Sequence, residues 1–115
     1  MAYVPKLRHL FKIMFGIRDS QAAEGLFLEG SIEFESGDIE SARLMFTYGT
    51  RLDPNLAGNF YNLGAVAEKC NAPAAERIAV WERYLAAAAR DPRQPEETRE
   101  RVRQRIQELK EGAVT

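Results

Sequence analysis

Residues 23–56 read AEGLFLEGSIEFESGDIESARLMFTYGTRLDPNL, and residues 57–92 read AGNFYNLGAVAEKCNAPAAERIAVWERYLAAAARDP. Each segment has an aromatic-rich stretch with a glycine in its middle, then a break, a second apolar stretch and a closing Asp-Pro. No segment alternates with the period of a strand over a useful length. The two segments therefore predict two helix–turn–helix units, with a period near the roughly 34 residues typical of such repeats.

Proline, glycine and aspartate divide the whole chain into about six expected helices. Asp19 or Ser20 is placed to cap the second helix, and Pro73 and Pro95 suit the first positions of the last two. The chain should be all-α, with antiparallel helix pairs joined by short turns. The expected helices cover about residues 5–16, 20–36, 39–52, 56–70, 73–90 and 95–111. They divide into a basic amphipathic segment (1–18), two helical hairpins (19–92), and a capping helix with a tail (93–115).

Residue types at fixed offsets resemble the tetratricopeptide repeat family over about residues 23–92. Small residues stand where paired helices would approach, large apolar residues stand beside them, and a proline closes each segment. The matching positions are Leu26, Gly30, Gly37, Ala42, Phe46, Gly49 and Pro54, then Phe60, Leu63, Gly64, Ala67, Val80, Tyr84, Ala87 and Pro92. The resemblance implies a TPR-like α-solenoid with a polar capping helix. Losing Phe46 to alanine should cost about 3–5 kcal/mol.

The chain departs from the family pattern in two places. The second segment is longer around its turn, so we expect its second helix to gain a turn. Glu29 and Glu33 stand where the family usually has large apolar residues. Either Leu28 and Ile32 turn inward instead, or the two acids meet basic side chains from the N-terminal segment.

By resemblance to the family, the first helix of each pair lines a concave groove that binds another protein. Three aromatic side chains would form an apolar strip there, suited to an amphipathic helix or an extended peptide. In the other interpretation, the chain's own N-terminal helix fills this strip. The carboxylate clamp of some family members is not expected, because only Asn62 and Lys69 could contribute to it. The groove positions would be Glu24, Phe27, Ser31, Phe34, Glu35, Gly58, Tyr61, Asn62, Ala65, Glu68 and Lys69.

Positive charge is concentrated at the start of the chain. Residues 1–18 carry four basic residues and no acid, whereas the rest carries 12 basic and 17 acidic residues. The segment predicts a short amphipathic helix between Pro5 and Gly16. It either packs on the next helix and covers an exposed end of the core, or docks on a membrane surface or large membrane complex. The candidate docking residues are Lys6, Leu7, Leu10, Phe11, Lys12, Met14 and Phe15.

The last helix is expected to be a solvated cap. Thr98, Val102, Ile106 and Leu109 form one narrow apolar stripe, and the arginines beside it alternate with glutamates. This mixture, and a net charge of −1, argue against a nucleic-acid binder.

Composition limits the chemistry further. The 115 residues are 45% hydrophobic and 29% charged, which is ordinary for one globular domain. A single cysteine, Cys70, and a single histidine, His9, exclude the common zinc patterns, and we expect Cys70 to be a small buried group. Glu29 and Glu33 lack the companion Glu-x-x-His of di-metal bundles. Trp81 fits either the core or the surface.

We therefore predict a non-catalytic adaptor or assembly subunit that binds a partner peptide or helix and needs no metal or cofactor. The alternative is a peripheral anchor that uses residues 1–18, and self-association through that segment stays open. No apolar run approaches the roughly 18 residues of a membrane span. The expected location is the cytoplasm, at a membrane periphery if the alternative holds.

Overall fold

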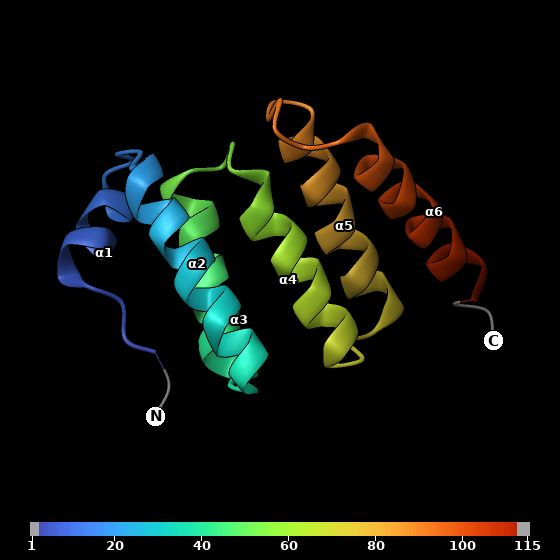
Figure 1. The fold of residues 1–115 in the computed structure, drawn as a ribbon, viewed down its shortest axis with the longest axis horizontal. Coiled ribbons are helices and arrows are strands. Elements are labelled where there is room, and N and C mark those ends of the chain that lie inside the picture. Colours follow the sequence, from blue (N-terminus) through green and yellow to red (C-terminus); the bar gives the residue numbers. More distant parts are fainter. Residues whose placement is uncertain (1–2, 113–115) are drawn as a thin grey trace.

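The computed structural model describes residues 3–112, which form six helices and no strand. The all-α prediction is confirmed, and each helix begins and ends within two residues of the expected place. In Figure 1 the helices follow one another across the molecule, with α1 and α6 at opposite ends of the row. Their bounds are α1 (Leu7–Met14), α2 (Ser20–Ser36), α3 (Ile39–Leu52), α4 (Ala57–Lys69), α5 (Ala74–Ala88) and α6 (Glu96–Gly112).

Adjacent helices pack against each other in two pairs. The pairs are α2 with α3 and α4 with α5, and α3 contacts α4 where the pairs meet. Helix α6 packs on α5 beyond the second pair. Helix α4 also touches α2, so the first helices of the two pairs face the same side of the molecule (Figure 1).

Short polar residues fix the helix starts. Asp19 caps α2 by accepting a hydrogen bond from the Ala22 amide at 2.9 Å, and Asp38 caps α3 through the Ser41 amide at 3.1 Å. Each carboxylate satisfies an amide that has no partner inside the helix. Gly37 separates α2 from α3 with φ of 95°, a left-handed conformation that costs glycine little.

The two Asp-Pro sequences give the pairs the same closing contact. The buried Asp53 carboxylate accepts a hydrogen bond from the Ser20 hydroxyl at 2.7 Å, at the start of α2. The buried Asp91 carboxylate accepts one from the Ala57 amide at 3.1 Å, at the start of α4. Each aspartate thus joins the end of one pair's second helix to the beginning of its first.

Glycines allow the paired helices to approach closely. A methyl group at Gly30 would lie 2.5 Å from the Phe46 ring, and one at Gly64 would overlap the Trp81 indole. Trp81 is therefore part of the core, where it is buried between α4 and α5. These two ring-on-glycine contacts fix the separation within each pair.

The structure corrects two expectations about the pairs. Helix α5 has 15 residues and α3 has 14, so no extra helical turn is gained. The added length lies in the turn between α4 and α5, where Asn71 has φ of 51°, and between the end of α5 and Asp91. Leu28 and Ile32 do not turn inward, because both side chains are exposed on α2.

Helix α6 covers the outer side of α5 with the predicted stripe. Val102, Ile106 and Leu109 are buried in one cluster with Trp81 and Tyr84. Thr98, the fourth member of that stripe, is half-buried at its edge. The charged face of α6 points away from the cluster, with Arg103 held between Glu96 and Glu100.

Candidate binding groove

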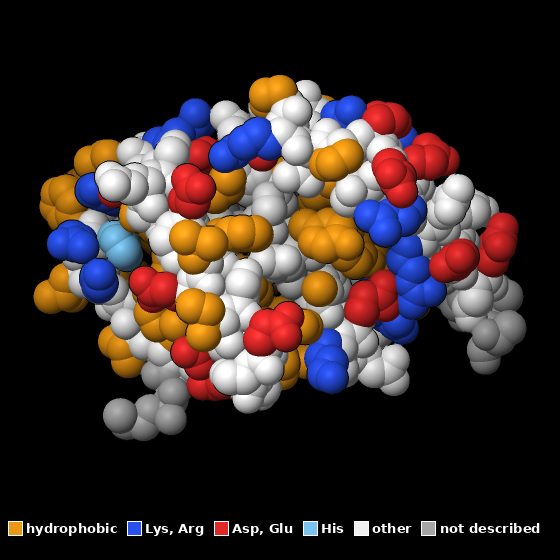
Figure 2. Space-filling model, in the orientation of Figure 1, with side chains coloured by type: hydrophobic (Ala, Val, Ile, Leu, Met, Phe, Trp, Pro, Cys, Tyr) orange, Lys and Arg blue, Asp and Glu red, His pale blue; other side chains and the backbone are white. Residues whose placement is uncertain are grey.

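A shallow groove runs along the face formed by α2, α4 and the start of α6. It consists of three adjoining hollows of about 160, 380 and 150 Å³. Asn62 lines both the first and second hollows, and Phe27, Gly58 and Gln94 line both the second and third, so the three hollows adjoin one another. Figure 2 shows hydrophobic side chains gathered in the middle of one face, with mixed charges toward α6.

Three half-buried aromatic side chains supply the apolar part of this groove. Phe27 lies against α4 at Gly58, where a methyl group would come within 2.8 Å of the ring. Phe34 packs on the cluster that contains Phe46. Tyr61 meets the rings of Trp81 and Tyr84 edge-on, each at a centroid distance of 5.4 Å. The rings are thus held by the core and still reach the hollows.

Polar groups join the two sides of the groove. The Ser31 hydroxyl donates to the Phe27 carbonyl at 2.7 Å and accepts from the Asn62 amide at 3.3 Å. The fully buried Asn59 amide donates to the Ala23 carbonyl at 3.1 Å, which ties α4 to α2 below the groove. These bonds fix the spacing of the two helices whose side chains line the hollows.

Most groove positions named from the sequence line these hollows. Two do not, because Lys69 is exposed outside them and Glu68 turns toward α5 and α6. The Glu68 carboxylate accepts hydrogen bonds from Arg105 at 2.7 and 2.8 Å, from Arg77 at 3.0 Å and from the Trp81 indole at 3.1 Å. Arg105, then Arg77 and Trp81, lower the pKa of Glu68 to about 2 despite its partial burial. The positions in the hollows are Glu24, Phe27, Ser31, Phe34, Glu35, Gly58, Tyr61, Asn62 and Ala65.

Residues after Asp91-Pro92 complete the groove, although the repeat pattern did not predict them there. Gln94, Thr98 and Arg101 line the central hollow beside Phe27 and Tyr61. The Asp-Pro repeat contains a signal for this arrangement. One Asp-Pro precedes α4 and the other precedes α6, so α6 stands in the chain where the first helix of a further pair would begin, and its first turns reach the central hollow.

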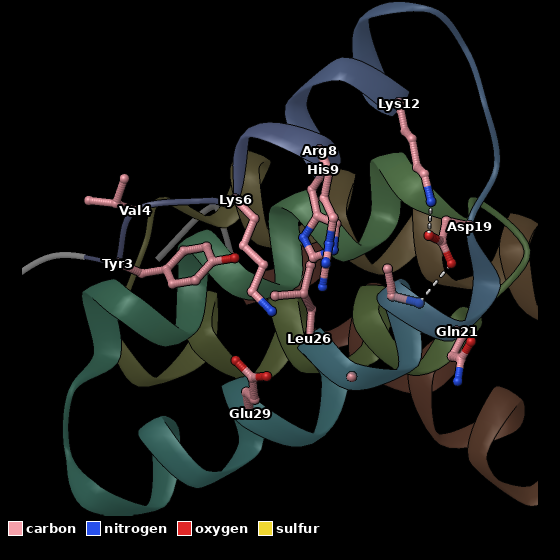
Figure 3. Close-up of a pocket in the computed structure, with 12 residues that line it drawn as sticks. Tyr3, Val4, Lys6, Arg8, His9, Lys12, Asp19, Gln21, Leu26 and Glu29 are labelled. Carbon is pink, nitrogen blue, oxygen red and sulfur yellow. Dashed lines mark hydrogen bonds and ion pairs between the residues drawn. The ribbon is translucent and has the colours of Figure 1, made fainter.

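The N-terminal segment does not fill the groove. None of the described residues 3–18 lines the three hollows. Helix α1 instead lies over the other side of α2, above a recess of about 550 Å³ (Figure 3). The interpretation that this segment occludes the aromatic strip is therefore wrong for residues 3–18.

Helix α1 faces the body with its polar side. The buried His9 and the half-buried Ile13 face inward, and Lys12 forms an ion pair with Asp19 at 2.5 Å. Burial, followed by the charges of Arg8 and Lys6, lowers the pKa of His9 and so favours the neutral imidazole. In Figure 3 the Lys6, Arg8, His9 and Lys12 side chains point into the recess, toward the side of α2 that carries Asp19 and Glu29.

The predicted docking residues are mostly on the opposite side of α1. Leu7, Phe11, Met14 and Phe15 are 56–84% exposed, whereas Leu10 is half-buried. Val4 and Ile17, next to the helix, are 81% and 46% exposed. The expectation that α1 covers an exposed end of the core holds for Ile13, which packs on the cluster that contains Leu26 and Leu52, but not for the rest of its apolar side. We call the exposed group Val4, Leu7, Phe11, Met14, Phe15 and Ile17 the α1 apolar face.

Cys70 and His9 lie apart and do not form a reactive cluster. Cys70 is exposed, contrary to expectation, because it follows the last turn of α4 where the chain leaves the core. It lines a hollow between α3, α4 and α5, whereas His9 lines the recess under α1. Within residues 3–112, no three His, Cys, Asp or Glu side chains are grouped to hold a metal.

Comparisons of this chain with protein-family models, with curated proteins and with solved structures found no match. Among the described residues, every helix is too short or too polar to traverse a lipid bilayer.

Proposed function

We propose that this protein is an adaptor that binds a peptide or helix of a partner protein in the α2–α4–α6 groove. One observation carries the proposal. Phe27, Phe34 and Tyr61 come from two helices and are half-buried in adjoining hollows on one face. Aromatic anchors in partly enclosed hollows supply much of the free energy of peptide binding.

The polar edge of the groove supports the same proposal. Ser31, Asn62 and Gln94 place hydroxyl and amide groups beside the aromatic rings. Glu24, Glu35 and Arg101 add both signs of charge along the length of the groove. An amphipathic helix or extended segment has the matching alternation of apolar and polar groups. The two helices are pre-spaced by Asn59, which reduces the ordering cost of binding.

We further propose that the chain belongs to the tetratricopeptide repeat family and that its role is non-catalytic. Two helix pairs, each with a glycine against an aromatic ring and an Asp-Pro closure, support the family assignment. The groove lining supports the second statement, since its Ser31 hydroxyl is bonded to a backbone carbonyl and an amide instead of a general base.

A groove-filling substitution tests the proposed function. Peptides selected from a displayed random library against the purified protein should bind it, and Ala65→Arg should weaken that binding by at least about tenfold. Ala65 is half-buried in the hollow next to Asn62, so arginine there fills space that the peptide would use. Isothermal titration measures the dissociation constants.

The matched control is Ala86→Arg, which makes the same change at an exposed helical position of α5 outside the groove. Peptide binding should be unchanged in this variant, and both variants should keep the circular dichroism of the parent protein. Equal affinity of the selected peptides for the Ala65 and Ala86 variants would place binding elsewhere and reject the proposal.

A further inference from the structure

The α1 apolar face is the largest group of exposed apolar side chains that belongs to one segment. It contains six of the eight large hydrophobic residues that are exposed among those described, and the other two are Leu28 and Ile32 on α2. The Phe11 and Phe15 rings lie together at a centroid distance of 4.6 Å. A contiguous apolar surface of this kind marks an interaction site in a soluble domain.

This face is held in place from behind. The Lys12–Asp19 ion pair, the buried His9 and the half-buried Ile13 join α1 to α2 and α3 without using any residue of the α1 apolar face. The backbone amide of Asp19 also donates to the Leu52 carbonyl at 2.9 Å, which anchors the connection between α1 and α2. Helix α1 lies at one end of the row, so the body of the protein does not obstruct approach to it (Figure 1).

The charge around this face is positive. Residues 3–18 contain four basic residues and no acid. Lys12 is neutralised by Asp19, and Arg18 lies 3.8 Å from Asp53. Lys6 and Arg8 are exposed, and within residues 3–112 neither has an ion-pair partner. Figure 2 shows Lys and Arg side chains beside the hydrophobic ones at the α1 end of the molecule.

We propose that the α1 apolar face docks on an anionic lipid bilayer, with α1 lying in the plane of the interface. A short amphipathic helix with aromatic and aliphatic residues on one side and basic residues on the other inserts its apolar side among the headgroups. Lys6 and Arg8 lie across a helix about 10 Å wide, which slightly exceeds the Debye length of about 8 Å in physiological salt. Both side chains are exposed, so their charge reaches anionic headgroups in a partly screened form that strengthens as the salt concentration falls.

A second copy of the chain is a poorer occupant of this surface. In a two-fold contact the α1 faces of both copies would meet, and two segments of the same positive charge would be brought together. An anionic bilayer presents the opposite charge over the whole contact. The proposal is independent of the groove, which lies on the other side of α2.

Vesicle co-sedimentation tests this assignment with the full chain. The protein should sediment with vesicles of phosphatidylcholine that contain about a quarter phosphatidylglycerol, and much less with pure phosphatidylcholine. Phe11→Ser combined with Phe15→Ser should lower the partition coefficient by at least about tenfold. Leu28→Ser combined with Ile32→Ser is the matched control, because it removes two exposed apolar side chains from α2 and should leave partitioning unchanged.

A second pair of substitutions tests the charge. Lys6→Gln combined with Arg8→Gln should lower partitioning by a few-fold and by at most about 25-fold, the limit of about fivefold for each charge at the surface, and higher salt should also lower it. Failure of the parent protein to sediment with anionic vesicles would overturn the proposal. So would equal partitioning of the phenylalanine variant and its α2 control. Concentration-dependent self-association in analytical ultracentrifugation, abolished by the phenylalanine variant and without vesicle binding, would assign the face to a second copy instead.

Discussion

The two ends of the helix row use amphipathic helices in opposite ways. Helix α6 turns its apolar stripe inward, with Val102, Ile106 and Leu109 buried on α5, and leaves its charged side in solvent. Helix α1 turns its polar side inward, with His9 and Lys12 toward the body, and leaves its apolar side in solvent. Periodicity alone describes both helices equally well. Which side of an end helix is buried therefore depends on the residues of the body that it packs against.

Truncating an apolar side chain should show the largest difference in stability between the two end helices. Ile106→Ala should lower the free energy of unfolding by about 2–4 kcal/mol, because it leaves a cavity between α5 and α6. Leu7→Ala, at a side chain 84% exposed, should change it by less than about 0.5 kcal/mol. Urea denaturation followed by circular dichroism measures both values. Similar losses at the two positions would show that α1 is as much a part of the core as α6.

The Glu68–Arg105 ion pair, which attaches α6, should make the stability of the fold depend on pH in the acidic range. The folded-state pKa of Glu68 is about 2, below its ordinary value of 4.5, because Arg105, Arg77 and Trp81 stabilise the carboxylate. A depressed carboxyl pKa stabilises the fold fully above about pH 4.5, and that contribution is lost as the pH falls toward 2.

We expect this loss to be about 2 kcal/mol, after allowing for the partial exposure of the Glu68–Arg105 pair. Denaturation midpoints measured between these pH values should show it, and Glu68→Gln should flatten the curve. A parent protein and a Glu68→Gln variant with the same pH dependence would contradict this role of Glu68.

The Lys12–Asp19 ion pair, which attaches α1, should contribute less to stability than the Glu68–Arg105 pair, and its loss should affect α1 alone. Asp19→Asn keeps the α2 cap, since asparagine is as good a capping residue, and removes the carboxylate that pairs with Lys12. The half-exposed pair should be worth about 0.2–1 kcal/mol. Amide hydrogen exchange in α1 should become a few-fold faster while exchange in α5 and α6 is unchanged. Faster exchange throughout the molecule would mean that α1 is not a separate local unit.

The sequence predicted the helix ends correctly, because a proline or glycine constrains the backbone and its hydrogen bonds at its own position. The positions of Gly37, Pro54, Pro73 and Pro92 predicted the helix ends, because these residues interrupt helical hydrogen bonding wherever they occur. The matching Asp-Pro sequences predicted two similar units, and the structure gives both aspartates the same closing contact.

The sequence did not predict which side chains are buried or paired when this depends on a neighbour from another helix. The spacing of Leu7, Phe11 and Met14 predicts an apolar side of α1, but it contains no information about what that side faces. Leu28 and Ile32 are exposed for the same reason. Glu68 was placed in the groove by its position in the helix, but Arg105, 37 residues later in the chain, binds it instead. Pairings over such separations depend on the final packing of α4, α5 and α6.

Gly58 gives the groove a property that neither helix pair has alone. Phe27 rests on this backbone, and any side chain at residue 58 would have to displace the ring. The Phe27–Gly58 contact thus sets the approach of the two pairs on this face, together with the Asn59–Ala23 and Ser31–Asn62 hydrogen bonds. Substituents at residue 58 would push the Phe27 ring aside and so change the shape of the central hollow, which makes this position suitable for altering ligand selectivity.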